Sequence, residues 1–174
     1  MNDALATLRS LHQQVSQRAG ELAERFHAAT GHPRSCGLAC TRCCQDDLTV
    51  FEIEAQLIQH HHAELLAEAT PGPPGACAFL DSDGACRVYE QRPYVCRTQG
   101  LPLRWLEPDG EGGGLEYRDI CPLNESDAGV PLVELPPEAF WTIGSWESKL
   151  RMIQELRDAG QGHRVPLRTL FARR

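Results

Sequence analysis

The residues with the most distinctive chemistry in this sequence are its cysteines. Eight are present, and half of them crowd into the stretch from Cys36 to Cys44. The full set is Cys36, Cys40, Cys43, Cys44, Cys77, Cys86, Cys96 and Cys121. Thiolates are strong ligands for zinc and for iron–sulfur clusters. The pattern therefore predicts a metal centre, with disulfides or unbound thiols as the alternatives.

The redox state of these thiols depends on the compartment. The first ten residues are acidic near the start and contain no apolar run, so they lack the pattern of a signal peptide. No stretch approaches the roughly 20 apolar residues of a membrane span. We therefore expect a cytoplasmic protein with no membrane contact, in which thiols stay reduced and clustered cysteines serve as ligands more often than as bridges.

The spacing of the thiols constrains the kind of centre. The Cα atoms of the adjacent residues Cys43 and Cys44 are about 3.8 Å apart and their side chains usually diverge, so they suit two metals or a polynuclear cluster. The triplet Cys36-x3-Cys40-x2-Cys43 has the spacing of the radical-SAM cluster loop. However, a helix precedes it and the chain is short for that barrel. A 4Fe–4S cluster and Zn2+ both remain open as cofactors, because both need deprotonated sulfur.

Three helices are predicted around the cysteines. Apolar residues recur at helical spacing over residues 3–28, and Gly31 ends the pattern. A capping-box pattern at Thr49 and Glu52 predicts a second helix to about residue 68. Prolines followed by an apolar face predict a last long helix over residues 136–160. The basic residues beyond it predict a solvated, loosely held tail: Arg164, Arg168, Arg173 and Arg174.

The middle of the chain, residues 30–125, predicts an irregular cysteine-rich region with short β-hairpins. Residues 81–84 predict a turn, because a calcium loop would need later acidic ligands that are missing. Short β-prone runs at 101–106 and 115–120 predict a hairpin that returns Cys121 to the cluster. We expect one domain, 1–174, of the α+β class and mostly α, in which long helices frame this small metal-binding middle.

Some polar residues invite a functional interpretation that their spacing does not favour. His60, His61 and His62 are consecutive on a predicted helix, so their side chains diverge by about 100° per residue and do not converge on one ion. The glycines within residues 107–114 lack the Lys-Ser/Thr of a phosphate loop. These residues are therefore predicted to be exposed helix positions and a flexible loop.

Several motifs together resemble the YkgJ-type cysteine cluster family, also called the CxxCxxCC or zinc- or iron-chelating domain. The resemblance covers roughly residues 30–125 and rests on Cys36-x3-Cys40-x2-Cys43-Cys44, Thr49-x-x-Glu52, Phe79-Leu80 and Cys86-x-Val-Tyr89-x-x-Arg92-Pro93-x-x-Cys96-Arg97. The first gap is three residues, where the family pattern has two. The resemblance implies that all eight cysteines are ligands. It also implies that Tyr89, Arg92 and Arg97 surround the cofactor, where N–H donors and positive charge tune thiolate ligands.

Three functions are compatible with these features. The first is a metal-binding protein with an iron–sulfur or zinc centre and a redox, metal-handling or partner-supporting role. The second is an enzyme that uses an open iron–sulfur site for redox chemistry or methyl transfer. The third is a structural zinc module that presents its long helices to a partner protein. Metal ions are the expected partners, and the net charge of −7 argues against nucleic acid.

Overall fold

The computed structural model describes residues 2–37, 40–110 and 113–171, with side chains except at residues 2 and 126–128. The chain forms two compact units. The first unit comprises Met1–His12, Leu38–Cys96 and Lys149–Arg174, and the second comprises Gln13–Gly37 and Arg97–Ser148. The predicted α+β class, mostly α, is confirmed. The single domain expected for residues 1–174 stays a prediction.

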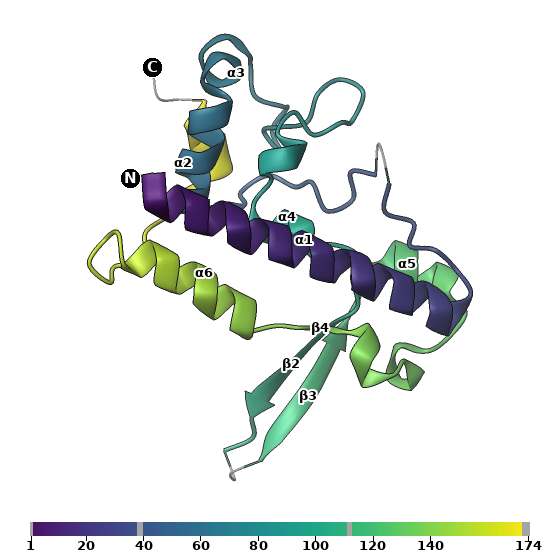
Figure 1. Cartoon of the computed structure of the whole chain (residues 1–174). Coiled ribbons are helices and arrows are strands. Elements are labelled where there is room, and N and C mark those ends of the chain that lie inside the picture. The colour runs from purple at the N-terminus through teal and green to yellow at the C-terminus, as the bar shows by residue number, and fades with distance from the viewer. Residues whose placement is uncertain (1, 38–39, 111–112, 172–174) are drawn as a thin grey trace. The chain divides into compact units, whose positions relative to one another are not determined.

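The N-terminal helix was predicted correctly from its apolar periodicity. Helix α1 runs from Asn2 to Thr30 (Figure 1) and contains the predicted span of residues 3–28. Gly31 follows its last residue, and the φ of +76° at this position is a left-handed conformation that glycine adopts without steric cost. The residues of its apolar stripe are buried: Leu8, Leu11, Val15, Ala19, Leu22 and Phe26.

The first unit contains a two-stranded antiparallel sheet and two consecutive helices. Strand β1 (Thr49–Phe51) pairs with β5 (Arg164–Pro166). Helix α2 (Glu52–His61) follows β1 directly, and α3 (Ala63–Glu68) comes after a break at His62 (Figure 1). Predicting one helix from Thr49 to about residue 68 was therefore wrong, because the main chain of residues 49–51 pairs with a strand more than a hundred residues away.

The cap of α2 also differs from the sequence prediction. The carboxylate of Glu54 accepts a hydrogen bond from the Phe51 N–H at 3.3 Å, in place of the predicted Thr49 and Glu52 pair. His60 and His61 are exposed, as predicted. The third histidine of the triplet, His62, lies at the helix break, where its Nε2 is 2.7 Å from Gln91 Oε1.

The C-terminal segment is an integral part of the first unit. After β5, the short 3-10 helix η4 (Leu167–Leu170) places Leu167, Leu170 and Phe171 in a buried cluster. The other members of this cluster come from β1, α2, α3 and the cysteine-bearing segments: Val50, Ala55, Ile58, Leu66, Ala78, Phe79 and Val88. The predicted loose tail is therefore wrong for residues 164–171. Arg173 and Arg174 lie outside the described residues.

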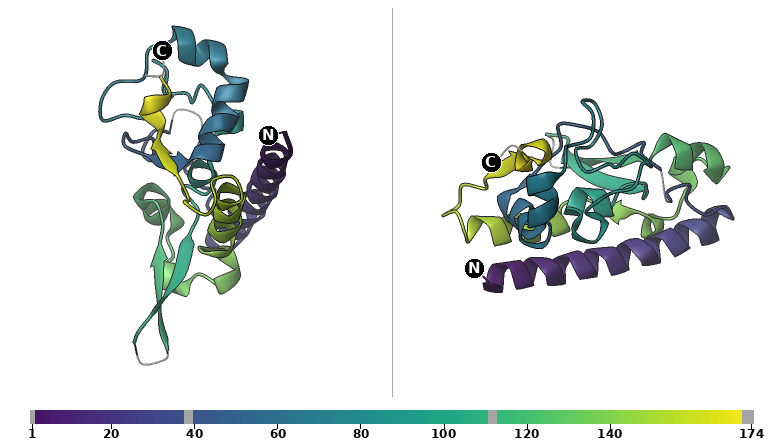
Figure 2. Two further views of the ribbon diagram at one scale, coloured as in Figure 1. Left: turned by 90° about the vertical axis from the view of Figure 1, so that its left-hand side faces the viewer. Right: turned by 90° about the horizontal axis from the view of Figure 1, so that it is seen from above.

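The second unit is organised on a three-stranded sheet of order β3-β2-β4. Strands β2 (Leu103–Pro108) and β3 (Gly114–Asp119) form an antiparallel hairpin, which confirms the prediction (Figure 2). Residues 111 and 112 of the connecting loop lie outside the described residues. After β3 comes helix α5 (Pro122–Ala128), with Cys121 at its N-cap. A separate apolar cluster lies in this unit: Phe26, Ile120, Leu135 and Phe140.

The single long helix predicted over residues 136–160 is wrong. After the 3-10 helices η2 (Leu132–Glu134) and η3 (Pro137–Ala139), strand β4 (Trp141–Thr142) pairs in parallel with β2. The Trp141 N–H donates to the Pro102 carbonyl at 2.7 Å, a tertiary hydrogen bond that outweighs the helical periodicity. Gly144, at φ +127°, then allows the turn into the shorter helix α6 (Ser145–Glu155).

Candidate metal centre

Two cysteine-bearing segments lie side by side at the Cys43–Cys44 pair. This pair lies in a turn in which the Cys44 N–H donates to the Thr41 carbonyl at 2.9 Å. The next residue, Gln45, forms an antiparallel bridge with Ala76. The Cys77 N–H then donates to the Cys44 carbonyl at 2.9 Å. These backbone contacts hold Cys44 and Cys77 at neighbouring positions.

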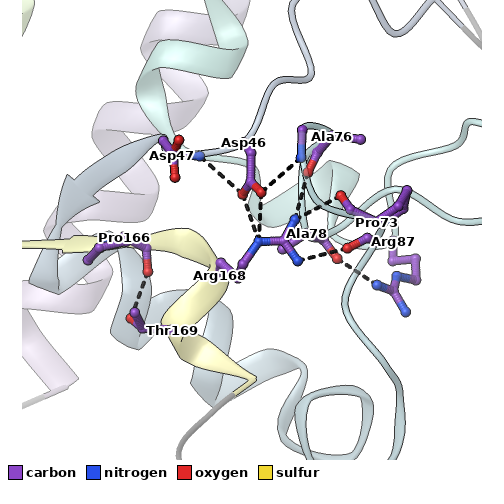
Figure 3. Close-up of polar contacts among 11 residues, drawn as sticks. Asp46, Asp47, Pro73, Ala76, Ala78, Arg87, Pro166, Arg168 and Thr169 are labelled. Atoms are coloured by element: carbon purple, nitrogen blue, oxygen red, sulfur yellow. Dashed lines mark hydrogen bonds and ion pairs between the residues drawn. The ribbon is translucent and has the colours of Figure 1, made fainter.

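A tight turn brings the next cysteine back toward Cys77. Asp81 Oδ1 accepts hydrogen bonds from the N–H groups of Asp83 at 2.9 Å and Ala85 at 2.8 Å, which confirms the turn predicted at residues 81–84. Leu80 and Cys86 then form an antiparallel bridge, and the Arg87 side chain donates to the Ala78 carbonyl at 2.6 Å (Figure 3). The turn therefore returns Cys86 alongside the segment that carries Cys77.

A buried carboxylate positions Cys96. Cys96 lies in helix α4 (Tyr94–Arg97), which follows the 3-10 helix η1 (Tyr89–Gln91) and Pro93. The Tyr94 N–H, at the start of α4, donates to Glu54 Oε1 at 2.7 Å. Glu54 is 3 % exposed, and its Oε1 also lies 3.3 Å from His12 Nε2. Helix α2 therefore fixes the residue two positions before Cys96.

Burial and neighbouring charges shift the pKa values of the thiols in these segments. Burial raises the pKa of Cys96 to about 12, and the negative charges of Cys77, Cys86 and Cys43 contribute. Burial also raises the pKa values of Cys77 and Cys86. Within the adjacent pair, a hydrogen bond from Cys44 lowers the pKa of Cys43 to about 6, while the pKa of Cys44 is raised.

Five partly buried thiols of the first unit therefore come from separate segments and influence one another electrostatically. We call them the thiol cluster: Cys43, Cys44, Cys77, Cys86 and Cys96. Ionising several neighbouring, partly buried thiols is costly because their charges repel, and a bound cation reverses that cost. Zinc and iron–sulfur clusters both accept such soft donors. Among the residues that the structure describes, however, no three His, Cys, Asp or Glu side chains already form a metal-holding group.

The remaining cysteines are placed differently. Cys40 belongs to the first unit and is half-buried, directly after residues 38 and 39, which are not described. Cys36 and Cys121 belong to the second unit. All eight residues lie in the described part of the chain, and none of them is in a disulfide. The convergence of all eight thiols on metal, and the return of Cys121 to the cluster, stay predictions.

Asn124 organises the surroundings of the two cysteines of the second unit. This residue is 1 % exposed, and its Nδ2 donates to Cys36 Sγ at 3.4 Å and to the Gly100 carbonyl at 2.7 Å. Its Oδ1 accepts from the Ser35 N–H at 2.7 Å, and its own N–H donates to the Cys121 carbonyl at 2.8 Å. One buried amide therefore links both cysteine-bearing segments to residue 100.

The three residues predicted to surround the cofactor have separate environments. The Arg92 guanidinium carbon lies 3.8 Å from the centre of the Tyr89 ring, which is 59 % exposed. Burial is the main cause that raises the pKa of Cys86, and the positive charge of Arg92 partly offsets this increase. Arg97 belongs to the second unit and donates to Ser16 Oγ at 2.8 Å. Their roles at a cofactor stay predictions.

The sequence interpretation missed the residues that hold the cysteine segments in place. Three side chains that are distant in the sequence bind backbone groups one or two residues away from a cysteine: those of Glu54, Asn124 and Arg168. Asp46, which pairs with Arg168, lies two residues after Cys44. No motif or periodicity links these residues to the cysteines, so spacing alone gave no signal for them.

Comparison with known proteins gives one match. Residues 35–111 match the family model CxxCxxCC, described as a "putative zinc- or iron-chelating domain". This span contains every cysteine except Cys121. No curated protein and no solved structure matches the chain. The resemblance drawn from the sequence is therefore confirmed over residues 35–111, the part of the chain that matches the CxxCxxCC family model.

Proposed function

We propose that this protein binds zinc or iron through the thiolates of its first unit. The observation that carries the proposal is the thiol cluster, in which five partly buried cysteines from the segments 43–44, 77, 86 and 96 influence one another electrostatically. The family match supports the same function, because the domain is described as zinc- or iron-chelating.

The chemistry of the donors fits both candidate groups. Zinc in structural sites takes four thiolate or imidazole ligands in a tetrahedron, and iron–sulfur clusters are held by cysteine thiolates. The five clustered thiols, with Cys40 nearby in the chain, exceed the four ligands of one closed site. We therefore propose a centre with more than one metal ion, either paired zinc sites or a 4Fe–4S cluster that uses four of these thiols. The group, when bound, would supply either electron transfer or structural cross-linking.

The cellular role follows from the identity of the metal. Of the helices in the described ranges, none combines the length and apolar character needed to cross a bilayer. We propose a cytoplasmic location, in which reduced thiols are available for metal. An iron–sulfur centre would fit a redox or metal-handling role, whereas closed zinc sites would fit support of a partner protein.

Metal analysis of protein purified without oxygen tests the proposal. We expect zinc, or iron with inorganic sulfide, in stoichiometric amounts, and loss of most of it in Cys77→Ser and Cys96→Ser variants. A His60→Ala/His61→Ala variant is the matched control, because imidazole is also a metal ligand in proteins and both residues are exposed in the same unit. Wild-type protein without metal that also fails to take up zinc or iron would contradict the proposal, as would metal lost only in the histidine variant.

A further inference from the structure

The guanidinium of Arg168 binds both sides of the contact between the first two cysteine-bearing segments. Its Nε donates to both carboxylate oxygens of Asp46, at 2.7 and 2.9 Å (Figure 3). Its Nη1 donates to the Gly72 carbonyl at 2.8 Å, and its Nη2 to the carbonyls of Pro73 at 3.0 Å and Ala76 at 2.9 Å. One side chain from η4 thus joins the chain after Cys44 to the loop before Cys77.

Asp46 completes this connection. Its Oδ2 accepts from the Gly75 N–H at 3.2 Å, and its Oδ1 accepts from the Asp47 N–H at 3.1 Å. The Arg168 guanidinium holds the pKa of the Asp46 carboxyl below its usual range, so the pair stays ionised at neutral pH. The planar fork of arginine is suited to several acceptors at once, which a lysine ammonium cannot span.

We propose, building on the function above, that Arg168 is a positioning residue for the metal centre and holds Cys44 and Cys77 in register for metal. Arg168 lies 57 positions beyond the end of the family match at residue 111. The metal-binding unit therefore extends past the CxxCxxCC domain and requires the C-terminal segment of β5 and η4. The buried residues Leu167 and Leu170, on either side of Arg168, anchor that segment.

The positioning role of Arg168 depends on the shape of its guanidinium more than on its positive charge. The Arg168 guanidinium donates to the Asp46 carboxylate and to three backbone carbonyls of the loop before Cys77. Only a planar group with several N–H donors can reach all of these acceptors at once. A substitution that keeps the positive charge but removes the fork should then release the loop of residues 72–77 from Asp46.

The test compares Arg168→Lys with Arg164→Lys in the full-length protein. Arg164 is the matched control, because it lies on the same segment but its hydrogen bonds go to Thr49 and its guanidinium stacks on the Phe51 ring at 4.5 Å. For Arg168→Lys we expect the affinity for metal, measured by transfer to a competing chromophoric chelator, to fall about tenfold or more, the usual scale for partners that orient ligands. Asp46→Asn should act in the same direction, and Arg164→Lys should match the wild type.

A measurement on metal-free protein separates this inference from the proposed function. Amide hydrogen exchange should accelerate at Gly75 and Cys77 in Arg168→Lys but not in Arg164→Lys, since Asp46 and Cys44 accept from these N–H groups. If wild type binds no metal, the proposed function fails while the exchange result still decides whether Arg168 holds the loop. Equal exchange in the two variants, or equal metal transfer from them, would overturn the positioning role.

Discussion

Replacing Gly100 with alanine tests the close approach of Cys36 to the backbone of the second unit. Gly100 has φ +77°, and a Cβ added there would lie 2.1 Å from Cys36 Sγ and 3.1 Å from Asn124 Nδ2. Ordinary contacts of a Cβ begin at 3.4 Å, so the sulfur would have to move by about 1.3 Å. Such a shift would disturb the 3.4 Å hydrogen bond between Asn124 and Cys36.

The expected cost has two parts. Left-handed backbone costs a residue with a Cβ about 1–2 kcal/mol. The overlap with sulfur adds about 1–3 kcal/mol, the usual range for overpacking. Gly31→Ala isolates the first part, because Gly31 has φ +76° and its added Cβ would meet nothing within 4 Å. Gly100→Ala should therefore reduce the free energy of unfolding by about 1–3 kcal/mol more than Gly31→Ala does.

Tryptophan fluorescence is a suitable probe for this comparison. The three tryptophans, Trp105, Trp141 and Trp146, all belong to the second unit, as do both glycines. Urea unfolding of reduced, metal-free protein, followed by this fluorescence, then reports on the second unit. A Cys36→Ala/Gly100→Ala variant removes the sulfur that the new Cβ would overlap, so it should recover most of the difference in unfolding free energy between Gly100→Ala and Gly31→Ala. Equal destabilisation by the two glycine substitutions, or no recovery in the double variant, would refute the proximity of Gly100 and Cys36.

Three further predictions concern the first unit. Phe79→Ala, at a site 1 % exposed, should cost about 3–5 kcal/mol in urea unfolding, and Leu156→Ala, at a site 83 % exposed, should cost under about 0.5 kcal/mol. A similar loss in both would contradict the placement of the core. Glu54→Gln should lower the free energy of unfolding by about 1–3 kcal/mol, because one buried acceptor oxygen is replaced by an NH2 donor that faces the Tyr94 N–H or its neighbours. An unchanged free energy of unfolding would argue that Glu54 does not hold the start of α4. Hydrogen bonds, chiefly from a glutamine side chain, lower the pKa of Asp158 to about 2. The contribution of ionised Asp158 to the free energy of unfolding should therefore be complete above about pH 4 and should be lost as the pH falls toward 2. An NMR titration of Asp158 with a midpoint near the ordinary aspartate value would contradict this prediction.

Local patterns in the sequence predicted the elements that depend on local interactions. The apolar stripe of residues 3–28 gave α1, and the β-prone runs around the glycine-rich loop gave the β2–β3 hairpin. The turn at residues 81–84 followed from Asp81 and Gly84. In each case the residues that determine the conformation are close together in the chain, so their spacing contains the information.

Predictions failed where a distant partner decided the conformation. Thr49 became part of a strand because β5 pairs with it, and Trp141 left the predicted helix because its N–H binds the Pro102 carbonyl. The tail appeared polar in sequence, yet its apolar residues Leu167 and Leu170 are buried and Arg168 reaches the cysteine loops. The cysteines were evident from sequence as candidate ligands, whereas the residues that hold their segments were not, because those contacts arise only from the tertiary fold.

The most direct test of the central claim is X-ray absorption at the metal edge on protein purified without oxygen. If the thiol cluster holds the metal, the first coordination shell should consist of about four sulfur atoms at about 2.3 Å, the thiolate distance of zinc. An iron–sulfur centre would add metal–metal scattering to its sulfur shell. A first shell made only of oxygen or nitrogen, in protein whose eight thiols all react readily with an alkylating reagent, would contradict metal binding by these cysteines.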